Sequence, residues 1–176
     1  MHEVMEPPEE HENHPLIIPA SVTLAILAVL VAMATLLGHR ASTEEILLQG
    51  QANDQWGYYQ AKNSRSHEMQ GVADILATVS PIDKEKTQAL REKYIKESER
   101  YEKEKEEAGE KAKDLEKEKD LINRRGNRFD AGEVLLEIAL IICSLTLLTK
   151  KKAFWISGTI VGIVGVGVAL SGFLLG

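Results

Sequence analysis

The chain has 176 residues, with 21 basic and 27 acidic side chains and a formal net charge of −6. This acidic balance comes without a basic patch or interleaved aromatic and basic residues, which argues against nucleic-acid binding. The single cysteine, Cys143, excludes a disulfide within the chain and a zinc site built from several thiolates. Apolar residues are segregated into three blocks, at 16–37, 134–149 and 154–175, and charged residues fill the interval between the first two.

The three apolar blocks are long enough to cross the hydrocarbon of a bilayer, which takes about 20 helical residues. A compact soluble domain would interleave apolar and polar residues at helix or strand period instead. We therefore predict an all-α integral membrane protein with transmembrane helices at 16–38, 130–149 and 153–175. The lipid bilayer is its first predicted partner.

Residues 1–15 are acidic, contain proline and show no periodicity, so they are predicted to form a flexible tail. Because this tail contains no Lys or Arg and the next apolar run is long, the first block is predicted to be a retained anchor, not a signal peptide. His11 and His14 are weak candidates for a divalent metal, but two histidines in a flexible segment do not preorganise a ligand set. A solvated tail is the preferred interpretation, and no cofactor is predicted.

Residues 42–128 carry most of the charge and are predicted to form an extramembrane helical hairpin with its turn near 80–81. Proline disfavours helix at the residue before it, so Ser80-Pro81 interrupts an otherwise helical pattern. Two columns recur every seven residues: Ala52, Tyr59, Ser66 and Ala73 before the turn, and Tyr94, Tyr101, Ala108, Leu115 and Ile122 after it. This spacing predicts an antiparallel pair of helices about 55 Å long.

A fold-back at Ser80-Pro81 also predicts which residues face each other across the hairpin. The expected pairs are Tyr59 with Tyr101, Ala52 with Ala108, Ser66 with Tyr94, and Lys62 near Glu99. The companion column is mostly charged and consists of Leu90, Glu97, Glu104, Lys111 and Glu118. Such a thin apolar seam does not make a strong independent coiled coil. The hairpin is therefore predicted to need a neighbour, either a second copy or another membrane protein.

The approach to the second membrane helix contains both a break signal and a cap signal. Gly126-Asn127 is predicted to break or bend the charged helix. Asp130 and Glu133 have the spacing of a capping box for a new helix. At Ser42-Thr43, after the first membrane helix, a fresh start and a continuous helix both remain open.

The distribution of basic residues gives two opposed predictions of membrane orientation. Lys150, Lys151 and Lys152 lie in a short loop, which favours a cytoplasmic loop and an external hairpin. The basic residues that flank the membrane on the hairpin side favour the opposite orientation: Arg40, Lys119, Arg124, Arg125 and Arg128. We give the short loop more weight, because short loops obey the rule best.

Glu137 is the most informative single residue, because it lies about one turn inside the second membrane helix. Asp130, Glu133 and Glu137 share one helical face, and a carboxylate inside a membrane usually faces protein or water. One interpretation is an ion- or proton-handling site in an oligomer. The preferred interpretation is a carboxylate that reaches the headgroup region or bonds a Thr or Ser of a neighbouring helix, since the penalty falls near a helix end.

Glycines and aromatic residues supply the remaining candidates for contact surfaces. Gly158 and Gly162 have the spacing that lets two membrane helices approach closely, either in a packed ring of subunits or, as we prefer, within one chain. The pairing expected from a fold-back at Ser80-Pro81 places Tyr59 and Tyr101 inside the hairpin. Trp56 or Tyr58 is then the exposed candidate for docking a partner.

The segment from Gln51 to Lys62, which includes Asp54-Gln55-Trp56 and Gln60-Ala61-Lys62, resembles an uncharacterised bacterial membrane family. This family is known as domain of unknown function 4337. The similarity extends over most of the chain, including the arginine-rich approach to the second membrane helix and the basic turn after it. Asn53 and Gly57 stand where serine and alanine are expected. The resemblance implies a multi-pass protein of the bacterial inner membrane and brings no activity or functional residue.

The sequence contains no phosphate-binding glycine loop, no nucleophile with a base and no cluster at metal-ligand spacing. No small-molecule substrate is evident, and we predict that the protein is not an enzyme. We predict instead a structural or accessory membrane protein that self-associates or joins a larger complex through its hairpin. The alternative is an oligomeric channel or ion-translocating unit that uses Glu137.

Overall fold

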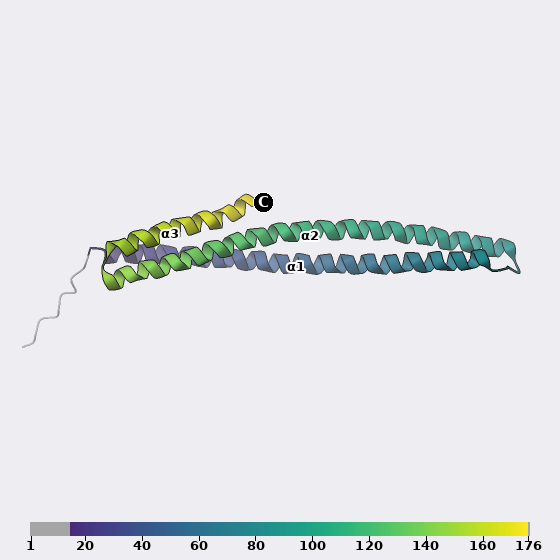
Figure 1. Cartoon of the computed structure of the whole chain (residues 1–176), viewed down its shortest axis with the longest axis horizontal. Helices are drawn as coiled ribbons and strands as arrows, with labels where there is room; N and C mark the ends of the chain where they lie inside the picture. The colour runs from purple at the N-terminus through teal and green to yellow at the C-terminus, as the bar shows by residue number, and fades with distance from the viewer. Residues whose placement is uncertain (1–14, 176) are drawn as a thin grey trace, which may run out of the picture. The chain divides into compact units, whose positions relative to one another are not determined.

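The structure, a computed structural model, describes residues 15–175, and every regular element in this part of the chain is helical. The elements are α1 (Ile17–Thr78), α2 (Lys84–Thr149), α3 (Lys152–Ser171) and a short 3-10 helix, η1 (Gly172–Leu175) (Figure 1). The predicted all-α fold is confirmed. Three helical stretches, within α1, within α2 and over Lys152–Leu175, are long and apolar enough to cross a membrane.

The chain divides into two compact units, which are described separately. Unit 1 consists of residues 1–40 and 124–176, and unit 2 consists of residues 41–123. The predicted tail at 1–15, with His11 and His14, lies outside the described residues except for Pro15. Both α1 and α2 contribute residues to each unit.

Helix α2 continues through Gly126 and Asn127, so the predicted break at these residues was wrong. A glycine inside a helix costs only about 1 kcal/mol relative to alanine, and the burial of Gly126 and Phe129 opposes that cost. Asp130 and Glu133 consequently lie inside a helix and do not cap a new one. Helix α1 is likewise continuous at Ser42-Thr43.

The chain reverses between α1 and α2 in a five-residue linker, Val79–Asp83. Asp83 caps α2, because its Oδ1 accepts a hydrogen bond from the backbone N–H of Lys86 at 3.1 Å. The hydroxyl of Thr87 donates to the backbone carbonyl of Asp83 at 2.8 Å. Proline at 81 cannot donate a helical hydrogen bond, and the aspartate then restarts the helix.

In unit 2, α1 and α2 pack antiparallel along columns of small and polar residues. The buried residues include Ala52, Ser66, Ala73, Ala108 and Ile122, which all belong to the columns expected from the sequence. The pairing register, however, differs from the prediction by about one turn. Ser66 bonds Ser98 instead of lying opposite Tyr94, and Lys62 pairs with Glu104 instead of Glu99.

Two physical causes account for this register. The linker of five residues moves the fold-back point toward α2, whereas the prediction assumed a tight turn at Ser80-Pro81. Packing then selects the alignment that places Gly109 against the ring of Tyr59, where a Cβ atom would lie 3.1 Å from Cδ2. The second column of α2 is consequently Ser98, Lys105, Ala112 and Lys119, in place of the predicted companion column.

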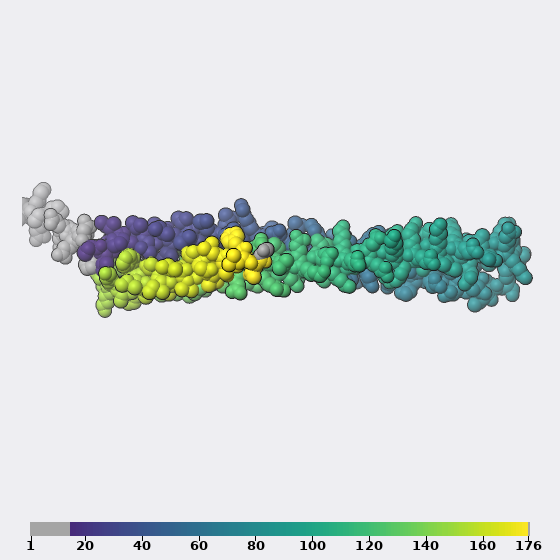
Figure 2. All heavy atoms as spheres, turned by 90° about the horizontal axis from the view of Figure 1, so that it is seen from above, coloured from purple at the N-terminus to yellow at the C-terminus, as the bar shows by residue number. Residues whose placement is uncertain are grey.

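In unit 1, the N-terminal part of α1, the C-terminal part of α2 and α3 pack together. Their core contains Leu27, Ala34, Leu136, Ala139 and Cys143. Figure 2 shows α3, in yellow, alongside the purple start of α1. The indole N–H of Trp155 on α3 donates to the hydroxyl of Thr23 on α1 at 3.0 Å, which joins these two helices directly.

Glycines set the distance between α3 and α2. A Cβ atom at Gly158 would lie 3.0 Å from the backbone nitrogen of Cys143 and 3.1 Å from the carbonyl oxygen of Ala139. A Cβ atom at Gly162 would meet Leu27 of α1 at 2.8 Å. Gly158 and Gly162 therefore serve packing within one chain in this structure, which is the use of small residues expected in membrane helices.

Candidate functional site

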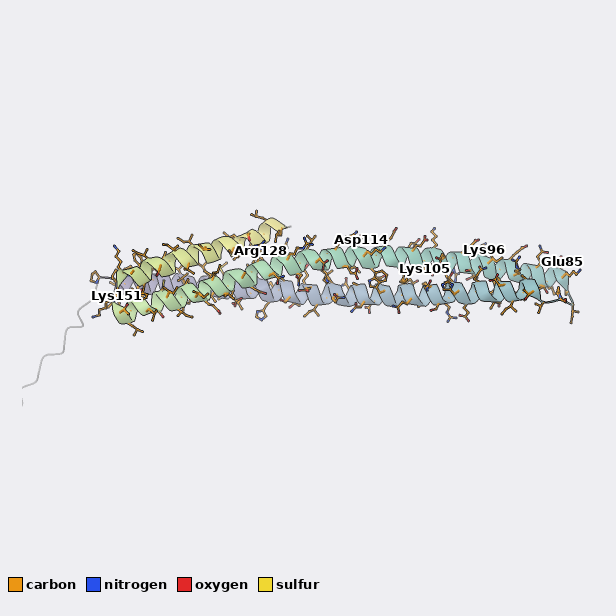
Figure 3. All side chains as sticks on the ribbon, in the orientation of Figure 1. Glu85, Lys96, Lys105, Asp114, Arg128 and Lys151 are labelled. Atoms are coloured by element: carbon orange, nitrogen blue, oxygen red, sulfur yellow. The ribbon has the colours of Figure 1, made fainter. Side chains whose placement is uncertain are left out.

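Aromatic and charged side chains gather where α1 and α2 face each other in unit 2. We call this group the hairpin cluster, and it consists of Trp56, Tyr58, Tyr59, Lys62, Tyr101, Glu104, Lys105 and Glu116. Figure 3 shows Lys105 between the two helices, while Lys96 and Asp114 are exposed on α2. The helices themselves position the cluster, because most of its members recur at three- and four-residue spacing along each helix.

Lys62 connects three members of the hairpin cluster. Its ammonium nitrogen lies 2.6 Å from Oε2 of Glu104 on the opposite helix. The same nitrogen lies 4.8 Å from the ring centroid of Tyr58 and 5.0 Å from that of Tyr101. Cation–π contacts of this kind add to the ion pair. Lys62 thus ties an exposed tyrosine, a half-buried tyrosine and the partner helix together.

Trp56 and Tyr59 form the aromatic side of the cluster. The indole N–H of Trp56 donates to Oε1 of Glu116 at 2.8 Å. Its ring meets the ring of Tyr59 edge to face, with centroids 5.4 Å apart. Both residues are half-buried, whereas Tyr58 is 47% exposed. Of the two candidates for a docking residue, Tyr58 is therefore the more accessible.

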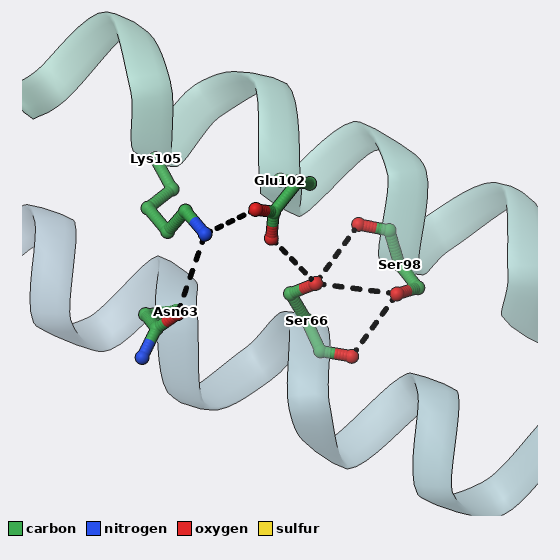
Figure 4. A network of polar contacts seen from close by, with 5 residues as sticks. All are labelled: Asn63, Ser66, Ser98, Glu102 and Lys105. Carbon is green, nitrogen blue, oxygen red and sulfur yellow. Dashed lines mark hydrogen bonds and ion pairs between the residues drawn. The ribbon is translucent and has the colours of Figure 1, made fainter.

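A buried polar layer lies beside the hairpin cluster and crosses the seam (Figure 4). The hydroxyls of Ser66 and Ser98 lie 3.2 Å apart, and the Ser98 hydroxyl also donates to the Ser66 carbonyl at 3.1 Å. Ser66 donates to Glu102 at 3.1 Å. Lys105 bonds both Glu102 and Asn63. Such a layer favours one register, because a slip of the helices would leave these groups buried without partners.

The ion pairs of unit 2 shift the titration of their members. The hydrogen bond from Lys62 lowers the pKa of Glu104, and the hydrogen bond from Lys105 lowers the pKa of Glu102. Conversely, Glu104 raises the pKa of Lys62, and Glu102 raises the pKa of Lys105. These pairs stabilise the hairpin while the carboxylates are ionised and the amines are protonated.

The stability of unit 2 is expected to fall at both ends of the pH scale. Since the pKa values of Glu102 and Glu104 are lowered, their contribution is complete above about 4.5 and is lost as the pH falls further. Since the pKa values of Lys62 and Lys105 are raised, their contribution is complete below about 10.5 and is lost as the pH rises further.

Thermal unfolding followed by Trp56 fluorescence in a Trp155→Phe background measures this dependence. The double variant Glu102→Gln/Glu104→Gln should reduce the loss of thermal stability at acidic pH, which we call the acidic limb. Glu107→Gln, on the exposed face of α2, is the control and should leave that limb unchanged. An acidic limb that persists in the double variant would contradict the assignment.

The carboxylates singled out in unit 1 lie in different surroundings. Glu133 is half-buried, and its Oε1 accepts a hydrogen bond from the hydroxyl of Thr35 on α1 at 2.6 Å. Glu137 is exposed on the surface of α2. Asp130 is also exposed, beside Gly38. The bond to a threonine of a neighbouring helix, considered for Glu137, is thus made by Glu133.

Replacing Thr35 by valine is expected to destabilise unit 1 by about 1–3 kcal/mol, because a half-buried carboxylate loses its donor. Thr146 supplies a matched control, since the residue is 2% exposed and its buried hydroxyl finds no hydrogen-bond partner in residues 15–175. Thr146→Val should therefore be neutral or stabilising. Denaturation of the detergent-solubilised protein, followed by Trp155 fluorescence in a Trp56→Phe background, compares the two variants. Equal losses of stability in the two variants would show that the hydrogen bond from Thr35 to Glu133 does not stabilise unit 1.

Sequence reasoning found the aromatic members of this site and missed most of its charges. Lys105, Glu102 and Glu104 stand among many similar residues of α2, and only the observed register distinguishes them. The sequence could have predicted that Ser66 pairs with a serine, because Ser98 lies four residues from Tyr94, its expected partner, on the same face of the helix. Within residues 15–175, no group of three or more His, Cys, Asp or Glu side chains could hold a metal ion.

Comparison with known proteins identifies the family and adds no activity. No curated protein and no solved structure matches the chain. A family described as domain of unknown function (DUF4337) matches residues 17–175, which include all three helices. The resemblance seen around Asp54-Gln55-Trp56 is thereby confirmed, and the chain belongs to the DUF4337 family.

Proposed function

We propose that this protein is a non-enzymatic structural or accessory component of a membrane, anchored by three transmembrane helices. Its hairpin, unit 2, extends into water and binds a second copy or a membrane-protein partner. The family resemblance and the apolar stretches of α1, α2 and α3 support the bacterial inner membrane as its location. The three lysines at the turn from α2 into α3 support a cytoplasmic position for that turn.

The observation that carries this proposal is the exposure of apolar side chains on the hairpin. At its closed end, Ile75 is 63% exposed, Val79 is 52% exposed and Ile82 is fully exposed. Near its other end, Ile46 and Leu47 are 73% and 60% exposed. Single exposed apolar residues are ordinary, but groups of them mark sites of protein interaction.

The packing inside the hairpin supports the same proposal. Its buried seam consists largely of alanine and serine, and its cross-helix bonds are polar. Small residues bury little apolar area, at about 25 cal/mol for each Å². A partner that covers the exposed isoleucines would add the apolar burial that the seam itself lacks.

Native mass measurement of the protein in mild detergent, together with crosslinking in native membranes, tests this function. We expect a homo-oligomer or a reproducible complex with another membrane protein. A chain that remains monomeric and without a crosslinked neighbour would overturn the proposal. Alkaline carbonate extraction tests the anchoring separately, because a protein released by carbonate does not span the bilayer.

The second candidate function is an oligomeric channel or ion-translocating unit that uses Glu137. It is favoured by the exposure of this carboxylate within an apolar stretch of α2, where a single chain would turn it toward lipid. Ion flux into proteoliposomes should then fall at least tenfold in Glu137→Gln. Absence of flux with the unchanged protein would remove this candidate and leave the structural role.

A further inference from the structure

Unit 1 contains an apolar groove between α1 and α3, with a volume of about 340 Å³. Its walls are Ile26, Leu27 and Leu30 from α1 and Gly162, Ile163 and Val166 from α3. The hydroxyl-bearing residues Thr23 and Thr159 line it as well. Because Thr23 also accepts the hydrogen bond from Trp155, the two helices are pinned together beside these residues, and the groove is apolar beyond them.

Three lysines follow the end of α2, and Trp155 lies three residues after the last of them. Lys150, Lys151 and Lys152 are all exposed, and Figure 3 shows Lys151 at the turn between α2 and α3. Lys150 has a φ of 54°, a left-handed conformation that a non-glycine residue adopts at a cost. No carboxylate in the described part of the chain pairs with these lysines. They form an unneutralised cationic turn.

Helical geometry aligns the cationic turn with the groove. Lys152, Thr159 and Val166 follow one another at seven-residue intervals on α3, so they lie on one face. Seven residues correspond to about 10 Å along a helix. The face of α3 that forms one wall of the groove therefore also carries the ammonium group of Lys152, about two turns nearer the start of the helix.

We propose that the groove and the cationic turn together bind one anionic phospholipid. Its phosphate group pairs with Lys152 and the adjacent lysines, and one of its acyl chains occupies the groove along Ile26, Leu30 and Ile163. The charge of the turn selects an anionic headgroup, because basic residues at a membrane surface attract such lipids. This inference rests on the membrane insertion proposed above and does not depend on self-association.

Lipid retention by the full chain in detergent, read by native mass spectrometry, tests the site. The probes are phosphatidylglycerol and phosphatidylcholine with identical acyl chains. We expect the unchanged protein to retain phosphatidylglycerol about five- to tenfold better. Replacing all three lysines by glutamine should bring the retention of the two lipids close to parity, and Lys84→Gln, at the first residue of α2, should change the retention of neither lipid.

A second pair of variants tests the groove itself. Ile163→Phe fills the groove and should reduce retention of both lipids at least fivefold. Val164→Phe is the matched control, because Val164 is exposed on the same turn of α3 and does not line the groove. It should leave retention unchanged.

Equal retention of the two lipids by the unchanged protein would overturn the headgroup assignment. Equal effects of the two phenylalanine variants would overturn the groove assignment. A change of oligomeric state in Ile163→Phe, without loss of lipid, would assign the groove to a second copy. Carbonate extraction of the same variants shows separately whether membrane insertion holds, so failure of the lipid site and failure of the anchor are distinguishable.

Discussion

Replacing Gly158 by valine is expected to separate α3 from α2 and to lower the free energy of unfolding of unit 1 by about 3 kcal/mol. A side chain at this position meets backbone atoms, namely the nitrogen of Cys143 at 3.0 Å and the carbonyl oxygen of Ala139 at 3.1 Å. Backbone atoms inside a helix cannot rotate away as a side chain can. The clash is therefore relieved only by moving one helix relative to the other.

Gly167→Val is the matched control for this variant. Gly167 lies on the same helix, and a Cβ atom there would have no neighbour within 4 Å. Its substitution should change the stability by less than about 0.5 kcal/mol. Denaturant titration with Trp155 as the fluorescent reporter, in a Trp56→Phe background, measures both variants. If the two valines have equal effects, close helix approach at Gly158 does not hold unit 1 together.

The sequence predicted which residues lie inside the hairpin better than it predicted which residues meet there. Periodicity depends on one helix at a time, so Ala52, Ser66 and Ala108 were correctly expected on the buried face. Register depends on the turn length and on the fit between two helices. The linker Val79–Asp83 and the contact of Gly109 with Tyr59 therefore shifted the partners of Ser66 and Lys62 from those predicted.

The polar residues of unit 1 show a second limit of sequence reasoning. The spacing of Asp130, Glu133 and Glu137 places all three on one face of the helix. Only Glu133, however, lies where the hydroxyl of Thr35 can donate a hydrogen bond to it. The break expected at Gly126 failed for a related reason, since local propensity opposes a helix by about 1 kcal/mol while tertiary packing favours it. Both outcomes depend on distant parts of the chain: Thr35 lies 98 positions from Glu133, and Phe129 packs against Phe173.

A pair of charges at the closed end of the hairpin is expected to weaken self-association at least about 30-fold. The variant is Ile75→Glu/Ile82→Glu, and the estimate corresponds to about 2 kcal/mol for the loss of central apolar contacts. Ile82 is fully exposed and Ile75 is 63% exposed in the single chain, so the substitutions remove little internal packing. Dissociation on dilution at constant detergent concentration, followed by sedimentation, measures the effect, and Trp56 fluorescence verifies that unit 2 remains folded.

Ala61→Glu/Ser64→Glu is the control, because it introduces the same two charges on an exposed face of α1 away from the linker. If the control weakens association and the first variant does not, the contact lies along the rods instead of the closed end. If neither variant changes a stable oligomer, the membrane-embedded helices hold it together. The closed end is favoured because Ile82 is fully exposed within residues 15–175, and burying it in a partner therefore changes only the associated state.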